Sequence, residues 1–264
     1  MNNHNDLIKE QFNKQSATFG TMAGHYEALD LIIRLSQANG KDTVLDVACG
    51  PGIVACAFAQ KVAHVHGIDL VPAMIERAQE SQKAQGLTNM SWDIGHVNPL
   101  PYPHCHYSIV ACRFAFHHFA DPLAVLQEMT RVVKWEGKVV VVDVVTDSQS
   151  QANLYDRMEK LRDPSHTHAL TLSEMQNMFK EAELNLVEQH KYRMEVDVEE
   201  LLKATLTPSR QAEEFKQIIR ADMNHQKLGI NAFIKDDKLK FSFPIIIMVG
   251  IKQPPDNYGL SCCG

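Results

Sequence analysis

The sequence predicts a doubly wound α/β fold, in which helices cover both faces of a mostly parallel sheet. Three observations support this prediction. Between residues 40 and 145, apolar β-branched runs alternate with amphipathic segments, and this alternation is typical of buried parallel strands connected by helices. Proline and capping residues stand where several amphipathic segments begin. A final apolar run, residues 238–253, follows a long helical region and indicates that the sheet resumes there.

Helical patterns fill the first forty residues and precede the first strand. Five strand-and-helix units follow, with predicted strands at residues 42–48, 62–69, 90–95, 107–114 and 138–145. Pro72 occupies the first position of the helix after the second strand, and Gly86 ends that helix. Asp121 and Pro122 begin the helix after the fourth strand, as its N-cap and its first helical residue.

The pattern changes after residue 145, where a polar stretch leads to a predicted helix near Thr171–Ala182 and a strand near Asn185–Tyr192. A second helical stretch, about Val198–Gln226, contains a new helix start at Thr207 and Pro208. Helical segments that interrupt a sheet predict a cap over its edge. We place these insertions at about 146–170 and 193–240.

Three regions therefore follow one another along the chain. Residues 1–40 form an N-terminal helical layer, residues 41–145 form the α/β core, and residues 146–264 complete the same domain with the rest of the sheet. With 264 residues, of which 45% are hydrophobic and 22% charged, the chain is long enough for one large core. Nothing in the sequence specifies an oligomeric state.

The charge and the ends of the chain restrict its partners. A net charge of −6 without any run of lysine and arginine disfavours nucleic acid as a partner. The N-terminus lacks the pattern of a signal or transit peptide, and the apolar run Phe243–Ile251 is half a membrane span. These observations predict a cytoplasmic protein without an integral membrane segment.

The six cysteines lack the C-x-x-C spacing of zinc and redox motifs, which is consistent with a reducing cytoplasm. Cys262 and Cys263 are adjacent near the C-terminus. One interpretation is that this pair binds a soft metal or oxidises. The other, which we favour, is that it belongs to a C-terminal tail without a specific role.

A glycine-rich loop between the first strand and its helix predicts a nucleotide-type site. The stretch "VLDVACGPGIVA" places Gly50 and Gly52 where the turn needs unusual backbone angles and where a side chain would block a ligand. With Asp69 at the end of the next strand, these glycines also satisfy the dinucleotide-binding fingerprint. Asp46 distinguishes the alternatives, because an acid at this strand end repels a pyrophosphate and suits an ammonium or sulfonium group.

On these residues the sequence resembles the class I S-adenosylmethionine (SAM)-dependent methyltransferases, whose first motif has the form "LDxxCGxG" and whose second strand ends in an acid, as in "GIDL". It is most similar to the ubiquinone/menaquinone-methyltransferase-like group and its uncharacterised bacterial members, through "CRxAxHHFxD", "LRDPSH" and the final "GIK". The resemblance implies a Rossmann-like sheet of seven strands, with the last strand antiparallel. It also implies SAM as cofactor and S-adenosylhomocysteine as product.

The resemblance implies roles for particular residues. Asp46, Gly50 and Gly52 would line the methionine end of SAM, Asp69 would accept hydrogen bonds from both ribose hydroxyls, and Leu70 would pack beside the adenine. The N-terminal segment resembles one that folds over SAM as a lid, with Phe19 either a lid aromatic or a core residue. The complete predicted cofactor set is Asp46, Ala48, Gly50, Gly52, Asp69, Leu70, His96, Val97 and Phe19.

The residues expected at the adenine amino group depart from the family pattern. Where the family usually has "GDA", this chain has Gly95, His96 and Val97. His96 accepts a hydrogen bond from the amino group as neutral imidazole, or backbone groups hold the adenine while His96 faces solvent. Asp93 fills the role instead if the loop is shifted.

The loop "CRFAFHHF" after the fourth strand lies next to the reactive end of such a cofactor. His117 and His118 are candidate bases, each weighed against a packing role. A metal site is disfavoured, because adjacent helical residues point about 100° apart and no third ligand has zinc-like spacing. Arg113 either orients an anionic or carbonyl-bearing acceptor or forms a salt bridge. His166, in "LRDPSH", is a third candidate base or a solvated loop residue.

The sequence thus predicts a SAM-dependent methyltransferase that acts on a small-molecule acceptor, quinone-like or phenolic. Two alternatives stay open at this point. An NAD-dependent oxidoreductase is disfavoured by Asp46. A non-catalytic SAM-binding protein would keep the cofactor pocket without an acceptor site.

Overall fold

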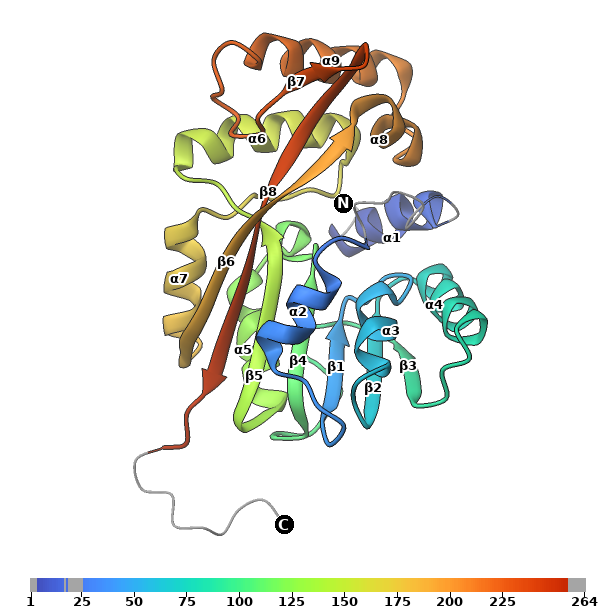
Figure 1. The fold of residues 1–264 in the computed structure, drawn as a ribbon, viewed down its shortest axis with the longest axis vertical. Helices are drawn as coiled ribbons and strands as arrows, with labels where there is room; N and C mark the ends of the chain where they lie inside the picture. Colours follow the sequence, from blue (N-terminus) through green and yellow to red (C-terminus); the bar gives the residue numbers. More distant parts are fainter. Residues whose placement is uncertain (1–3, 17, 19–25, 256–264) are drawn as a thin grey trace.

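The computed structural model describes residues 4–16, 18 and 26–255, and these contain one mixed sheet flanked by helices (Figure 1). The strand order is β3-β2-β1-β4-β5-β8-β6, and β7 pairs with β8. The strands are β1 (Thr43–Val47), β2 (His64–Asp69), β3 (Met90–Ile94), β4 (Tyr107–Arg113), β5 (Val133–Val144), β6 (Leu184–Asp197), β7 (Phe233–Lys235) and β8 (Lys238–Lys252).

The first five strands are parallel and the rest of the sheet is antiparallel. In register, Asp46 of β1 faces Gly67 of β2 and Ala111 of β4. The last strand, β8, runs antiparallel to both β5 and β6. The predicted doubly wound α/β fold with an antiparallel last strand is therefore confirmed.

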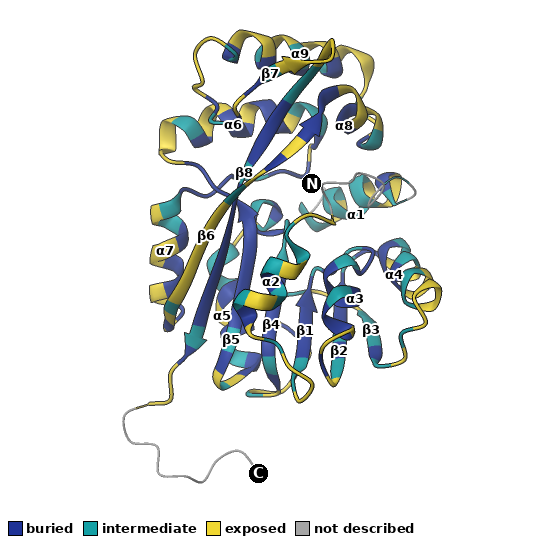
Figure 2. Cartoon of the chain, in the orientation of Figure 1, coloured by how far each residue is buried: buried dark blue, intermediate teal, exposed yellow. Residues whose placement is uncertain are grey.

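Helices cover both faces of the sheet because neighbouring strand residues point to opposite sides (Figure 2). Val44 belongs to the core under α2 and α3, whereas Leu45 belongs to the core under α5 and α7. The helices are α1 (His4–Gln15), α2 (Leu29–Ser36), α3 (Ile53–Ala59), α4 (Pro72–Ala84), α5 (Pro122–Val132), α6 (Gln149–Arg162), α7 (Leu172–Glu181), α8 (Val198–Ala204) and α9 (Ser209–Asp222).

Local sequence signals begin these helices as expected. The Asp121 side chain caps α5 by accepting a hydrogen bond from the Ala124 N–H at 3.0 Å. Thr171 and Glu174 form a capping box at the start of α7. The second helical stretch is divided into α8 and α9 at the Thr207-Pro208 start.

Several elements of the sheet differ from the sequence-based expectation, among them β5, which begins at Val133 rather than at residue 138. β6 continues to Asp197, five residues beyond the predicted end, because residues 193–197 find ladder partners in the long β8. The cap segment that we placed at 193–240 therefore begins in a strand. The sheet also has a short eighth strand, β7, which forms a hairpin with β8 through Asp236 and Asp237, both with positive φ.

Candidate active site

The carboxyl ends of β1, β2 and β4 lie at one edge of the sheet, where an open α/β sheet usually binds its ligand. Two cavities adjoin there. The larger, which we call the glycine-loop cavity, has a volume of about 300 Å³, and the smaller, the histidine cavity, has about 100 Å³. Phe12, Phe114 and His118 line both cavities and form the boundary between them.

Most residues of the predicted cofactor set meet in the glycine-loop cavity. Seven of them line it: Asp46, Ala48, Gly50, Asp69, Leu70, His96 and Val97. Phe19 lies outside the described residues. Gly52 is absent from this lining as far as the chain is described, so its role in cofactor binding stays a prediction. A Cβ atom at Gly52 would lie 2.7 Å from Trp92 Cη2 of β3 and 3.0 Å from Ala78 Cβ of α4, so close packing also favours glycine at this position.

The turn after β1 opens a space for a ligand. Ala48 and Gly50 both have left-handed backbone angles, with φ of 54° and 51°. A Cβ atom built on Gly50 has no neighbour within 4 Å. A side chain at Gly50 would therefore project into the free space at the turn, and a positive φ favours glycine.

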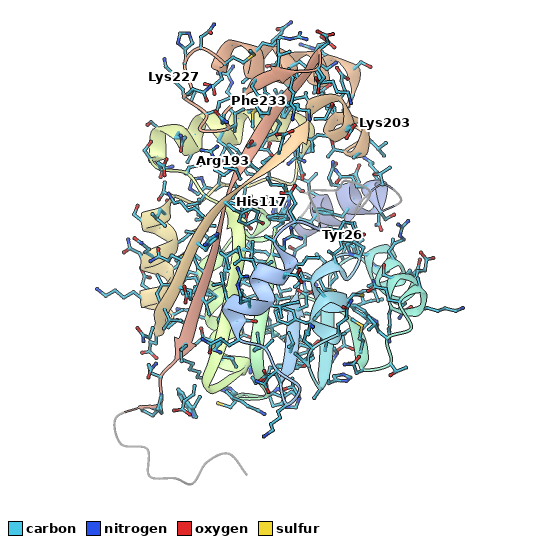
Figure 3. The ribbon with its side chains drawn as sticks, viewed as in Figure 1. Tyr26, His117, Arg193, Lys203, Lys227 and Phe233 are labelled. Carbon is cyan, nitrogen blue, oxygen red and sulfur yellow. The ribbon has the colours of Figure 1, made fainter. Side chains whose placement is uncertain are left out.

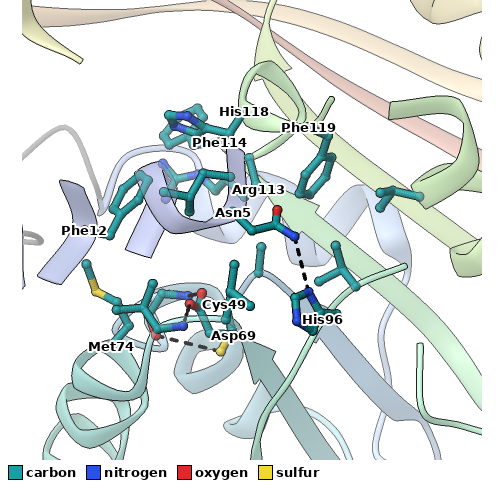
Figure 4. Close-up of a pocket in the computed structure, with 18 of the residues that line it drawn as sticks. Asn5, Phe12, Cys49, Asp69, Met74, His96, Arg113, Phe114, His118 and Phe119 are labelled. Atoms are coloured by element: carbon teal, nitrogen blue, oxygen red, sulfur yellow. Dashed lines mark hydrogen bonds between the residues drawn. The ribbon is translucent and has the colours of Figure 1, made fainter. Parts of the chain in front are cut away.

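Asp69 is fixed at the end of β2 by the backbone of two loops. Its Oδ2 accepts a hydrogen bond from the Gly50 N–H at 2.8 Å, and its Oδ1 accepts one from the Val71 N–H at 2.9 Å. Burial raises the pKa of Asp69, and the hydrogen bonds from Val71 and Gly50 oppose that shift. The carboxylate lines the cavity with lone pairs left for a ligand's hydroxyl groups (Figure 4).

Asp46 is a buried carboxyl group with an unsatisfied oxygen. The residue is 1% exposed, and its Oδ2 has no hydrogen-bond partner within the described residues. Burial is the main cause that raises the pKa of Asp46 to about 7. A buried acid of this kind favours a cationic partner, which would satisfy the oxygen and keep the group ionised.

At the far end of this cavity the structure places His96 in the lining, whereas Asp93 is outside it in the described part of the chain. His96 Nδ1 lies 3.4 Å from Asn5 Nδ2 of α1, which can donate to it (Figure 4). Asp93 has other partners, since it lies 2.9 Å from His66 Nε2 and accepts a hydrogen bond from the Tyr102 hydroxyl.

Helix α1 covers one side of the glycine-loop cavity (Figure 4). Asn5, Ile8 and Phe12 line it from one face of the helix, as their spacing of three and four residues requires. His4 Nε2 lies 2.7 Å from the carbonyl oxygen of His118, so its ring N–H can hold α1 against the loop after β4.

Arg113 lines the glycine-loop cavity and is not part of the described wall of the histidine cavity. Its Nη2 donates to the carbonyl oxygen of Glu27 at 3.2 Å, and its guanidinium lies 4.2 Å from the centre of the Phe114 ring. Burial lowers the pKa of Arg113. The structure therefore places this candidate with the glycine loop rather than beside His117 and His166.

The three candidate histidines come together in the histidine cavity, and His117 lies near the middle of the molecule (Figure 3). His117 Nδ1 lies 2.6 Å from Oδ1 of Asp143, which is 1% exposed. Burial alone would lower the pKa of His117, but the charge and hydrogen bond of Asp143 outweigh it and raise that pKa. Nδ1 carries the hydrogen toward the carboxylate, which leaves Nε2 as a proton acceptor.

His118 has a different environment from its neighbour. Its Nδ1 lies 3.1 Å from the carbonyl oxygen of Ser165, and its ring packs edge-on against Phe12 with centroids 5.1 Å apart. Burial, followed by the nearby His117, lowers the pKa of His118 to about 3. A neutral ring tied to the backbone in this way fits a packing role.

His166 belongs to a chain of polar side chains. Its Nε2 lies 2.7 Å from Asp156 Oδ1, and the second oxygen of Asp156 lies 2.8 Å from His168 Nδ1. The His166 ring is 5.4 Å from the His117 ring, centre to centre. His166 Nδ1 is buried without a hydrogen-bond partner in the described structure.

Sequence reasoning missed the two acids that hold these rings, Asp143 and Asp156. Asp143 interrupts the otherwise apolar run "KVVVVDVV", and a single acid in a fully buried strand is a signal for a paired or functional carboxylate. Asp156 carries no such signal, because acids are ordinary on the polar face of a helix.

No group of histidine, cysteine and acidic side chains among the described residues has the geometry to hold a metal ion. Across the same part of the chain, every helix is too short or too polar to cross a bilayer.

Comparisons with known proteins identify the family. Residues 38–227 match the family model described as "Methyltransferase domain". The chain is 32% identical over 234 residues to the uncharacterized methyltransferase YcgJ of Bacillus subtilis, covering 86% of this chain and 91% of that protein. It is 30% identical over 140 residues to a demethylmenaquinone methyltransferase of Deinococcus radiodurans, covering 47% of this chain and 58% of that enzyme.

Solved structures agree with this assignment. The crystal structure of Bacillus subtilis YcgJ superposes with a TM-score of 0.80 at 26% identity, covering 86% of this chain and 98% of that one. A putative methyltransferase from Bacillus halodurans gives a TM-score of 0.80 at 27% identity, with coverage of 86% and 99%. The chain therefore belongs to the methyltransferase domain family and is a SAM-dependent methyltransferase.

Proposed function

We propose that this enzyme methylates a small molecule that carries an acidic phenol-type or enol-type hydroxyl, on that oxygen or on the ring carbon conjugated with it. The observation that carries the proposal is the His117–Asp143 pair, at 2.6 Å, in a cavity that adjoins the glycine-loop cavity. A histidine held by a buried carboxylate is the usual arrangement for a general base.

The glycine-loop cavity suits SAM. The unsatisfied Oδ2 of Asp46 would accept a hydrogen bond from the cofactor's ammonium group. The open space at Gly50 would admit the methionine part of the cofactor, and Asp69 would accept hydrogen bonds from the ribose hydroxyls. When bound, SAM supplies a methyl group on a sulfonium for in-line transfer. We also propose that the N-terminal segment, with α1, acts as a lid that excludes water from this cavity.

The histidine cavity would receive the acceptor. His117 takes the proton of the reacting hydroxyl at Nε2, while Asp143 keeps the ring in the required tautomer and stabilises the charge that it gains. The oxygen becomes a stronger nucleophile as its proton leaves. His118 separates the two cavities and aligns the acceptor through shape.

The relatives support an acceptor of this class. The Deinococcus radiodurans relative is a demethylmenaquinone methyltransferase, and this chain spans just over half of it. An acceptor with an acidic hydroxyl on an aromatic ring is consistent with that name and with a base at His117. The NAD-dependent alternative is disfavoured because the buried Asp46 would repel a pyrophosphate.

The direct test is transfer of labelled methyl from SAM to a panel of naphthols, with matched naphthyl methyl ethers and naphthylamines. We expect product only from the naphthols, on oxygen or on the adjacent ring carbon. Methylation of the amines alone would contradict the proposal. SAM binding without transfer to any panel member would favour the non-catalytic alternative.

The pH dependence of kcat/KM is expected to show the base. His117 must be neutral to accept a proton, and Asp143 raises the pKa of His117 above its ordinary value. We therefore expect kcat/KM to rise with pH on the acidic side of the profile, with a midpoint above about 6.5. A profile measured from pH 5 to 9 checks this. This rise of kcat/KM with pH should be absent in His117→Gln, because glutamine keeps a hydrogen bond to Asp143 but accepts no proton. If the rise persists in that variant, it belongs to another group.

Asp46→Asn is expected to stabilise the SAM-free protein at neutral pH and to weaken SAM binding. The pKa of Asp46 in the folded state, about 7, exceeds the unfolded value, so ionising Asp46 destabilises the fold as pH rises from about 4 to 7. Relative to the wild type, the free energy of unfolding of Asp46→Asn should therefore increase by at most about 1.4 kcal/mol for each pH unit as the pH rises across that range. Urea unfolding at several pH values and titration calorimetry with SAM measure both effects. A variant that binds SAM as the wild type does would remove Asp46 from the site.

A further inference from the structure

The wall of the histidine cavity contains several buried polar atoms without a hydrogen-bond partner in the described structure. They are Gln15 Nε2, Glu159 Oε1, Arg162 Nε and His166 Nδ1. Three of these residues, Gln15, Glu159 and His166, are at most 3% exposed. Buried polar groups in native proteins are almost always paired, so their concentration in one small cavity indicates a polar ligand.

The chemistry of these atoms is fixed by their other contacts. Gln15 Nε2 and Arg162 Nε carry hydrogens and are donors. Glu159 already accepts a hydrogen bond from Arg162 through its other oxygen, which leaves Oε1 as an acceptor. His166 Nε2 faces the Asp156 carboxylate and must carry the hydrogen there, so Nδ1 is a second acceptor.

Two donors and two acceptors together specify hydroxyl groups. One hydroxyl accepts up to two hydrogen bonds and donates one, so a single hydroxyl can pair both donors and one of the two acceptors. A carbonyl group only accepts and would leave Glu159 and His166 unpaired. A carboxylate would bring a negative charge beside Glu159 and Asp163, which both line the cavity.

We infer that the methyl acceptor is a neutral molecule with a second hydroxyl beside the one that reacts, such as a catechol-type ring. Gln15 and Arg162 donate to this second hydroxyl, and either Glu159 or His166 accepts its hydrogen. The inference rests on the proposed function, in which His117 meets the reacting hydroxyl. His117 and His166 line the same cavity, with ring centres 5.4 Å apart, so one small acceptor can reach both rings.

The test compares 2,3-dihydroxynaphthalene with 2-naphthol, which share one ring system and differ by one hydroxyl. We expect the full-length wild-type protein to prefer the dihydroxy probe by about tenfold or more in kcat/KM, because the single hydroxyl leaves buried groups unpaired. Gln15→Leu removes one donor at nearly constant volume and should reduce that preference severalfold. Gln11→Leu, on the same helix but outside both described linings, is the matched control.

Comparing the two probes within each variant cancels their intrinsic difference in reactivity. If Gln15→Leu fails to fold in a thermal unfolding assay, Glu159→Gln provides the second variant. Equal kcat/KM values for the two probes, or an unchanged preference in the folded variants, would overturn this inference and leave the proposed function intact. Methylation of neither probe by protein that binds SAM would contradict the proposed function as well.

Discussion

Replacing His117 with alanine is expected to reduce kcat by about 10²- to 10⁴-fold at saturating SAM, the usual contribution of a general base. The physical reason is that the adjacent histidine cannot replace it as a base. His118 has a pKa near 3 and a ring nitrogen tied to Ser165. The affinity for SAM should be unchanged, because His117 lines only the histidine cavity among the described residues.

Steady-state assays on a naphthol acceptor, with SAM affinity measured by calorimetry, separate these two effects. His117→Gln should match His117→Ala in kcat, whereas His190→Ala, at an exposed position on β6, should match the wild type. A His117→Ala enzyme with near-normal kcat would show that the acceptor reacts without this base. A loss of SAM affinity in the same variant would instead give His117 a structural role.

Replacing Asp69 with alanine or with glutamate is expected to weaken SAM binding by at least about 100-fold. Two charge-assisted hydrogen bonds to ribose hydroxyls contribute about 1.5–3 kcal/mol each. Glutamate keeps the charge but misplaces it, because the Asp69 carboxylate is fixed by the N–H groups of Gly50 and Val71. Titration calorimetry with SAM and with S-adenosylhomocysteine measures the loss.

Asp30→Ala provides the control, since this exposed acid on α2 is outside the described lining of the cavity. Circular dichroism and thermal unfolding must show that each Asp69 variant is folded, because the side chain also pairs two backbone groups. A folded Asp69→Ala protein that binds SAM with wild-type affinity would remove Asp69 from the cofactor site.

Much of the fold is predictable from the sequence because local signals and the global pattern agree. The alternation of apolar runs and amphipathic segments gives the parallel strands, and Asp121 with Pro122 gives the start of α5. The extra residues of β6 are not predictable locally. Their strand conformation depends on pairing with the distant β8, and tertiary pairing overrides weak local preference.

The cavity that we propose for the cofactor is largely predictable for a related reason. Asp46, Gly50 and Asp69 stand in two short motifs at strand ends, and parallel strands bring those ends together. Motif reasoning did not show that Gly52 also packs against Trp92, where a Cβ atom would lie 2.7 Å from the ring.

The proposed acceptor site was only half predictable. The histidine pair was visible, but the partners that distinguish the two rings were not, because they come from β5 and from the loop before α7. The sequence shows that His117 and His118 are adjacent; only the fold shows that one is paired with Asp143 and the other with the backbone of Ser165.

A crystal structure of the enzyme with S-adenosylhomocysteine and 2,3-dihydroxynaphthalene tests the central claim most directly. We predict the aromatic ring in the histidine cavity, with one hydroxyl oxygen within hydrogen-bonding distance, about 2.6–3.2 Å, of His117 Nε2. The same oxygen or its neighbouring carbon should face the cofactor's sulfur. An acceptor bound outside this cavity, or with His117 Nε2 turned away from every acceptor oxygen, would contradict the account.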